Sequence, residues 1–286
     1  MKKIYCLLMV AGLVTACAKD DGAGDMPQGK GVVAFDATHQ LTVETRADNK
    51  IELGSLGITL PESADDLTLV IESQDPAHTE PFQYSGTVGA YNKDSRRTYL
   101  AEGGPYAAEV MWGNATTEGV DAAYFHGQTG FNVIARSYQA VPITAVMAKA
   151  MVRIDFTDSF KGYFENGAEM KLTTAAGATF DVNYTNGNAG KPFFVLAGDG
   201  KSFTITGKAK KQKPTANIAA PEVEFAAVGR DGSAGNEVAQ QTIYTYMFDV
   251  DAADNVSVEI TITNEPIQVI NVATKELNDD AVMGNN

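Results

Sequence analysis

The stretch from Val141 to Phe156 constrains the fold more than any other part of the chain. From residue 146 to residue 156 every even-numbered residue is apolar, and three of the five odd-numbered residues between them are charged. A period of two is typical of a β-strand with one buried and one wetter face. The apolar run is too long for one ordinary strand of about 5–6 residues. We therefore predict a crossing between two β domains, with the changeover near Ala148 and Ala150.

The rest of the chain favours an all-β fold. Its 286 residues have room for one or two domains with a sizeable core. β-branched and aromatic residues recur in short bursts separated by Gly, Asp, Asn and Pro, and long helical periodicity is missing. This pattern predicts two consecutive β-sandwich domains of Greek-key type, at residues 32–147 and 148–286.

One short helix is expected near residues 158–165, where the sequence reads DSFKGYF. Asp158 is the expected N-cap. Phe160, Tyr163 and Phe164 are spaced to bury one face of the helix.

The N-terminal residues predict the cellular compartment of the protein. Lys2 and Lys3 precede an apolar segment at residues 4–14, which is too short to span a bilayer. The segment Val14-Thr15-Ala16-Cys17 then resembles a bacterial lipobox, which implies a signal peptide at residues 1–16 and acylation of Cys17. An ordinary secretory signal with a chance cysteine stays open as the alternative.

The residues after Cys17 predict a flexible tether at residues 17–31, because they are polar, Gly-rich and without periodicity. The acidic sequence Lys19-Asp20-Asp21 is similar to the export signal of Bacteroidota surface lipoproteins. It implies an outer-membrane, lipid-anchored protein that faces the cell exterior. Since Cys6 would leave with the signal peptide, no disulfide is expected.

Charge and motifs narrow the function classes. Acidic residues outnumber basic ones 36 to 22, so nucleic acid is not an expected partner. Two near-matches to phosphate-binding loops lack essential residues, and His39, His78 and His126 are scattered without metal-ligand spacing. We therefore expect no enzyme activity, no cofactor, no metal and no catalytic residue. A Ser-His-Asp set assembled only in space stays open.

Two aromatic residues are candidate ligand contacts, namely Trp112 and Tyr124. Exposed rings of this kind stack on sugars or anchor protein partners. The alternative is that both rings belong to the sandwich core, and for Trp112 the alternation with Tyr106 and Val110 favours this interpretation.

Three segments carry a family resemblance. GGPYAAEVMWG, VDAAYFHGQTGFNV and AKAMVRIDFTDSFKGYF are similar to segments of a family of Bacteroidota surface lipoproteins of unknown function. Trp112 stands where the family has Tyr, and His126 where it has a second aromatic residue. The family resembles the fimbrillin-like proteins, which implies two sandwich domains of transthyretin-like or Ig-like topology and a role in surface pili.

A further resemblance concerns processing. Val43-Glu44-Thr45-Arg46-Ala47 is similar to the region where fimbrillin precursors are trimmed after an arginine. Cleavage at Arg46 would remove the first strand, expected at residues 32–46, and an extended segment such as residues 266–272 of another subunit would then fill the vacant position. The uncut, anchored form is the alternative, and the one we favour.

These observations lead to two hypotheses. The first is a non-enzymatic, surface-exposed outer-membrane lipoprotein of fimbrillin-like type, in adhesion or pilus-associated assembly, with the membrane and pilus subunits as partners. The second is a glycan-binding lipoprotein that works beside an outer-membrane nutrient importer. A hydrolase is a distant third.

Overall fold

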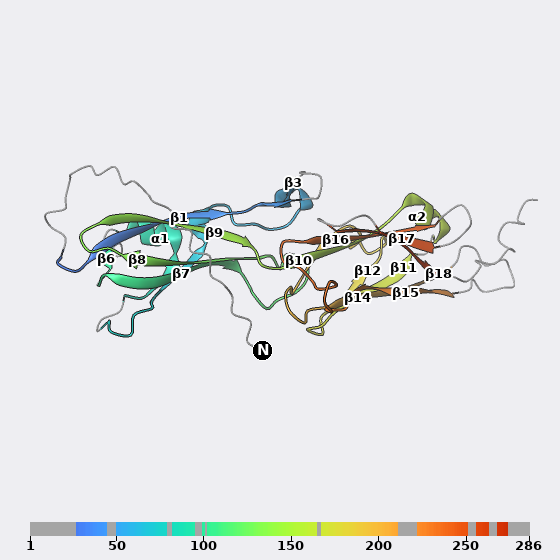
Figure 1. Cartoon of the computed structure of the whole chain (residues 1–286). Helices are drawn as coiled ribbons and strands as arrows, with labels where there is room; N and C mark the ends of the chain where they lie inside the picture. The colour runs from blue at the N-terminus through green and yellow to red at the C-terminus, as the bar shows by residue number, and fades with distance from the viewer. Residues whose placement is uncertain are drawn as a thin grey trace, which may run out of the picture.

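The computed structural model describes residues 27–44, 50–78, 82–94, 99–100, 102–164, 167–210, 222–250, 256–262 and 268–273. The described part is mostly strand, and it forms two groups of sheets that lie end to end (Figure 1). The predicted all-β sandwich fold is confirmed.

The first sandwich is built from strands β1 to β9. Seven of them form one sheet in the order β5-β4-β7-β8-β9-β1-β6, while β2 and β3 pair separately. Their bounds are β1 (Gly31–His39), β2 (Thr42–Glu44), β3 (Lys50–Glu52), β4 (Thr68–Ser73), β5 (Tyr84–Thr87), β6 (Tyr99–Leu100), β7 (Gly104–Gly113), β8 (Tyr124–Val133) and β9 (Tyr138–Met147).

This sheet folds into two layers because β8 and β9 pair only at one end. Their paired residues are Phe125 with Met147 and His126 with Val146. Beyond that point the two strands separate, and the apolar faces of β1 and β9 pack against those of β4, β7 and β8 in one buried cluster. Two short 3-10 helices, η1 (Leu53–Leu56) and η2 (Ala64–Asp66), and the helix α1 (Val88–Lys93) complete this part.

The second sandwich contains a five-stranded sheet, β13-β10-β16-β17-β18, and a four-stranded sheet, β12-β11-β14-β15. The bounds are β10 (Ala150–Phe156), β11 (Ala168–Thr174), β12 (Thr179–Val182), β13 (Pro192–Val195), β14 (Phe203–Lys210), β15 (Glu222–Arg230), β16 (Ile243–Val250), β17 (Val256–Ile262) and β18 (Gln268–Ala273). One buried cluster joins the facing sides of the two sheets.

The expected helix forms as α2 (Asp158–Tyr163). Phe160 and Phe164 are fully buried and Tyr163 packs partly against the core, as the spacing predicts. The N-cap is Thr157 and not Asp158: the Thr157 hydroxyl accepts a hydrogen bond from the Phe160 N–H at 3.2 Å. Threonine serves here because its side-chain oxygen reaches the third residue of the helix.

The two sandwiches meet where β9 ends and β10 begins, with Ala148 and Lys149 between them. At this point the chain passes from the seven-stranded sheet, which contains β9, to the five-stranded sheet, which contains β10. Met151, Phe194 and Ile243 belong to strands of the second sandwich, yet they pack in the buried cluster of the first. The buried cluster of the first sandwich therefore extends across the junction onto strands of the second.

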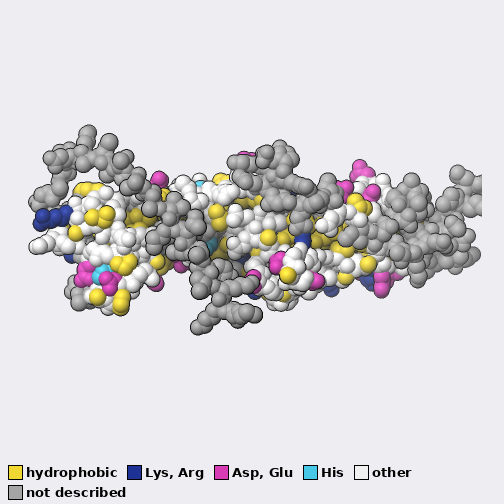
Figure 2. All heavy atoms as spheres, viewed as in Figure 1, with side chains coloured by type: hydrophobic (Ala, Val, Ile, Leu, Met, Phe, Trp, Pro, Cys, Tyr) yellow, Lys and Arg dark blue, Asp and Glu magenta, His cyan; other side chains and the backbone are white. Residues whose placement is uncertain are grey.

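On the side seen in Figure 2, the hydrophobic side chains of the described residues lie among polar atoms, with a few groups of acidic side chains. Within the described ranges, no helix is both long and apolar enough to cross a membrane.

Candidate functional site

The N-terminal strand β1 is the strongest candidate for a functional element. It pairs in parallel with β9 from Val32–Tyr138 to His39–Ala145, a continuous run of eight residue pairs. Its other edge pairs antiparallel with β6 at only two positions, Gly31 and Val32. The strand that follows the predicted tether is thus a structural part of the first sandwich and lies next to its edge.

One face of β1 is buried in the core. Val33 is fully buried and Phe35 is nearly so, and both belong to the buried cluster of the first sandwich. The Phe35 ring makes edge-to-face contacts with Tyr91 at 5.4 Å and with Phe131 at 5.6 Å between centroids. Such pairs stabilise beyond the area that they bury, so Phe35 holds β1 against both α1 and β8.

The first residue of β1 passes very close to the β8–β9 hairpin. A Cβ atom on Gly31 would stand 2.4 Å from the main-chain oxygen of Ile134. Only glycine fits at this position without displacing the main chain. We call the space that β1 occupies, bounded by β9, Tyr91, Asn92, Phe131 and the main chain at Ile134, the β1 slot.

The two candidate ligand aromatics lie on opposite faces of the sheet. Trp112 faces inward, half-buried, with its ring edge-on to Phe125 at 6.2 Å between centroids. Tyr124 faces outward, half-buried, and stacks on His126 at 6.0 Å. The two rings therefore do not form a common platform for a sugar.

Tyr124 belongs to a small polar cluster on the outer face. His126 Nε2 lies 2.6 Å from Glu109 Oε1, across the β7–β8 ladder. Burial, with the nearby Glu109 carboxylate, raises the pKa of the Tyr124 phenol above its ordinary value. The Tyr124 ring thus stacks on the imidazole, and the Lys149 ammonium lies 5.9 Å from its centroid.

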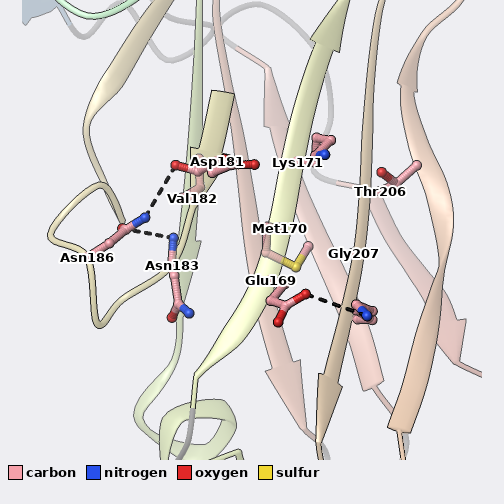
Figure 3. Close-up of a pocket in the computed structure, with 10 residues that line it drawn as sticks. Glu169, Met170, Lys171, Asp181, Val182, Asn183, Asn186, Thr206 and Gly207 are labelled. Carbon is pink, nitrogen blue, oxygen red and sulfur yellow. Dashed lines mark hydrogen bonds and ion pairs between the residues drawn. The ribbon is translucent and has the colours of Figure 1, made fainter. Parts of the chain in front are cut away.

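A second candidate site is a polar groove on the outer face of β11, with a volume of about 490 Å³. In Figure 3, Lys171 projects from β11 between Asp181 of β12 and Thr206 of β14, which are its partners in the two ladders. At the next position Glu169 lies opposite Lys208, with 3.6 Å between the charged atoms. Amide, carboxylate, hydroxyl and ammonium groups thus converge on one shallow surface.

His78 forms the arrangement closest to a catalytic set. The Ser73 hydroxyl lies 2.5 Å from its Nδ1, while its Nε2 lies 3.2 Å from the Gly103 oxygen. The carboxylates of Asp75 and Glu102 are 3.8 and 3.9 Å from the same Nε2. The His78 side chain is only 5% exposed, and its ring nitrogens connect the loop after β4 to the start of β7. This geometry ties two loops together and presents no base to a substrate.

Two of the predicted site residues, Cys17 and Arg46, lie outside the described residues. The lipid attachment and the processing site therefore stay predictions. Among the described residues, no three His, Cys, Asp or Glu side chains are grouped so as to hold a metal ion. Sequence reasoning missed Gly31 and Asn92 as site residues; for Gly31 the only signal was a glycine that opens an alternating strand.

The fold defines the class as an all-β protein of two sandwiches. The chain belongs to the family described as domain of unknown function (DUF4493), whose model matches residues 29–278. No curated protein matches the sequence.

The chain is also similar to solved structures from Parabacteroides and Bacteroides species. A fimbrial assembly protein from Parabacteroides distasonis is 8% identical, with a TM-score of 0.43, and the match covers 86% of this chain and 100% of that one. A protein from Bacteroides thetaiotaomicron described as polysaccharide binding is 8% identical, with a TM-score of 0.43 and coverage of 86% and 99%. A Bacteroides ovatus protein described as an adhesin is 9% identical, with a TM-score of 0.40 and coverage of 86% and 97%. Identities and scores this low transfer no function.

Proposed function

We propose that this protein is a non-enzymatic, lipid-anchored surface protein of the outer membrane that acts in adhesion or closes a pilus-type assembly. The observation that carries the proposal is the position of β1. The strand that follows the predicted anchor is built into the first sandwich by eight residue pairs with β9. Any load on the anchor is therefore transmitted directly into the folded part.

The predicted tether has the length that such a role requires. Between Cys17 and Gly31 an extended chain of 14 residues reaches at most about 50 Å. This is enough to hold the two sandwiches clear of a membrane surface. Because the molecule is elongated (Figure 1), its far end would project well beyond the tether.

The state of the N-terminus distinguishes an anchored protein from a trimmed subunit. Cleavage after Arg46 would remove all of β1 and with it the predicted lipid. The remaining sandwich would expose the edge of β9 and the apolar side chains that β1 covers, which invites strand addition by another chain. The proposal takes the protein as uncut, with β1 in place.

The test is N-terminal analysis of the protein isolated from native membranes. A blocked, acylated Cys17 as the sole N-terminus is the expected result. A free Ala47, together with a ladder of polymers on mild gels, would show instead that the protein is a trimmed, polymerising subunit.

A second candidate function is glycan binding, which the polar groove of the second sandwich favours. Lys171, Asp181 and Thr206 present donors and acceptors in one row, and sugars are bound by such groups. Glycan-array binding that Lys171→Ala and Asp181→Ala both abolish would support this function. Binding that both variants retain would place the ligand elsewhere.

A further inference from the structure

The outer edge of β1 is closed by a side chain and not by a strand at the position of Phe35. The Asn92 amide, on α1, donates from Nδ2 to the Phe35 carbonyl oxygen at 2.9 Å. Its Oδ1 accepts from the Phe35 N–H at 3.1 Å. One planar amide thus satisfies both main-chain groups that point away from β9, as a neighbouring strand would.

This contact fixes the register of whatever lies in the β1 slot. The backbone bonds of a parallel ladder such as β1–β9 repeat evenly along the strand, so these bonds alone do not set its register. The Asn92 amide engages a single residue, and Tyr91, beside it on the same helix, packs on the side chain of that residue. The main chain and the side chain at position 35 are therefore recognised together.

Two further positions are selective. At position 31 the Ile134 oxygen excludes any residue with a Cβ atom. At position 33 the side chain is fully buried, in a strand position that favours a β-branched residue. In the fixed register, the slot therefore accepts glycine at position 31, a β-branched residue at position 33 and an aromatic residue at position 35. Gly31, Val33 and Phe35 of β1 match this pattern.

The C-terminal strand of the chain does not fit this pattern. Residues 263–277, around β18, contain neither glycine nor an aromatic residue. Moreover, β18 is already paired with β17, from Val256–Ala273 to Ile260–Gln268. Inserted into the slot, it would leave the space between Tyr91 and Phe131 empty and would place a side chain against the Ile134 oxygen.

We propose that the β1 slot is specific for the chain's own residues 31–39 in a single register, set by Asn92 and the aromatic space at position 35. The protein is then closed by its own N-terminal strand and does not accept the C-terminal strand of another copy. This inference deepens the proposed function, because a closed slot suits an anchored or terminal subunit and not a repeating one.

The direct test uses the full chain with a site-specific protease sequence in place of residues 45–49. After cleavage the β1 fragment stays with the protein without a covalent bond. The nicked protein is unfolded in urea and refolded with its own fragment and one labelled competitor, and occupancy is read by size exclusion and mass spectrometry. The competitors are peptides of residues 27–44, the same peptide with Phe35→Ala or Gly31→Ala, and residues 264–277.

The native peptide should take about half of the slots at equal concentration. The Phe35→Ala and Gly31→Ala peptides should need at least about tenfold higher concentration, which corresponds to about 1.4 kcal/mol. The C-terminal peptide should take none. Occupancy by the C-terminal peptide within threefold of the native peptide would overturn the proposal.

A second measurement keeps the uncut chain and tests Asn92 directly. In Asn92→Ala, amide hydrogen exchange should rise about tenfold at Phe35 and less at Ala34 and Asp36, whose main-chain groups face β9. Lys93→Ala is the matched control, because its side chain lies next along α1 and is 80% exposed. Unchanged exchange at Phe35 in Asn92→Ala would refute the role of Asn92 even if no peptide enters the nicked protein.

These outcomes are independent of the proposed function. A native N-terminus at Ala47 would refute the uncut, anchored form without changing which peptide fills the slot. Conversely, a blocked Cys17 would leave the slot's specificity to be decided by the competition alone.

Discussion

The Glu118 carboxylate accepts a hydrogen bond from the main-chain N–H of Leu196 at 2.7 Å, although Glu118 follows β7 of the first sandwich and Leu196 follows β13 of the second. Its other oxygen accepts from the Thr174 hydroxyl at 2.5 Å. Next to it, Gly119 and Phe194 exchange two main-chain hydrogen bonds of 2.9 Å. The β7–β8 loop thus extends the edge of β13 and joins the two sandwiches.

The Lys149 side chain binds this loop. Its ammonium is buried, and it donates to the main-chain oxygens of Asn114, Thr117 and Ala122 at 2.7, 2.5 and 2.8 Å. An ammonium has three N–H donors, so all of them are used. The link between the sandwiches therefore depends on one charged side chain at the point where β9 gives way to β10.

We expect Lys149→Met to destabilise the protein by about 2–4 kcal/mol, because three loop carbonyls lose their donor in a buried place. The loop should also release its contacts with the second sandwich. Urea unfolding followed by separate probes on each sandwich is the measurement, with two distinct transitions expected in place of one. Lys161→Met is the control, because the Lys161 side chain on α2 is 40% exposed and lies far from this loop in the chain. A loss below about 0.5 kcal/mol would show that Lys149 does not hold the junction.

The pH dependence of stability reports on the same residue. Burial lowers the pKa of the Lys149 ammonium to about 8 from its ordinary 10.5, while the Glu118 carboxylate acts in the opposite direction. Between these two values the unfolded chain binds more protons than the folded one, so stability rises with pH, by up to roughly 3 kcal/mol. The free energy of unfolding of the wild type minus that of Lys149→Met, measured from pH 7 to pH 10.5, isolates this contribution. A flat difference would mean that the three carbonyls keep the pKa of Lys149 near its ordinary value.

Trp112→Ala should cost about 2–3 kcal/mol, less than the roughly 3–5 kcal/mol typical of a fully buried aromatic ring, because Trp112 is half-buried against Phe125. Urea melts give the value. Tyr138→Ala, whose ring is 58% exposed, should change stability by less than about 0.5 kcal/mol. If Trp112→Ala costs as little as Tyr138→Ala, the Trp112 ring does not contribute to the core and is free to bind a ligand.

Tyr91→Phe should leave stability unchanged or raise it by about 1 kcal/mol. The Tyr91 hydroxyl is buried and has no hydrogen-bond partner among the described residues. Burial, with Tyr84 nearby, also raises the pKa of this phenol. Removing an unsatisfied polar group relieves its desolvation cost while the ring against Phe35 stays. Tyr91→Ala, which removes the ring as well, is the contrasting variant in the same thermal melts. A marked loss in Tyr91→Phe would reveal a partner for the hydroxyl.

Cys17→Ser should yield protein that takes up no labelled palmitate and stays in the soluble fraction, because the thiol that carries the acyl chains is gone. Membrane fractionation with the wild type alongside is the measurement. A serine variant that still labels and sediments would contradict lipidation at Cys17, whereas a wild type that takes up no label would favour the ordinary secretory signal.

Local pattern alone was enough for the main architecture. The period of two from Val146 to Phe156 predicted β-strands here and a crossing near Ala148, and the structure ends β9 at Met147 and begins β10 at Ala150. The spacing of Phe160 and Phe164 predicted the buried face of α2. These features follow from side-chain periodicity, which depends on neighbours close in the sequence.

Only the tertiary structure decided which residues far apart in the chain are in contact. The pairing of Asn92 with Phe35 bridges 57 positions, and that of Glu118 with Leu196 bridges 78. A lone lysine in an alternating segment is expected to be solvated, yet Lys149 is buried, because the pairing of β7 with β8 places the loop that supplies its three acceptors beside it. The sequence determined which faces are apolar, and the packing of the sheets determined which polar groups meet, because a hydrogen bond is set by distance in space and not along the chain.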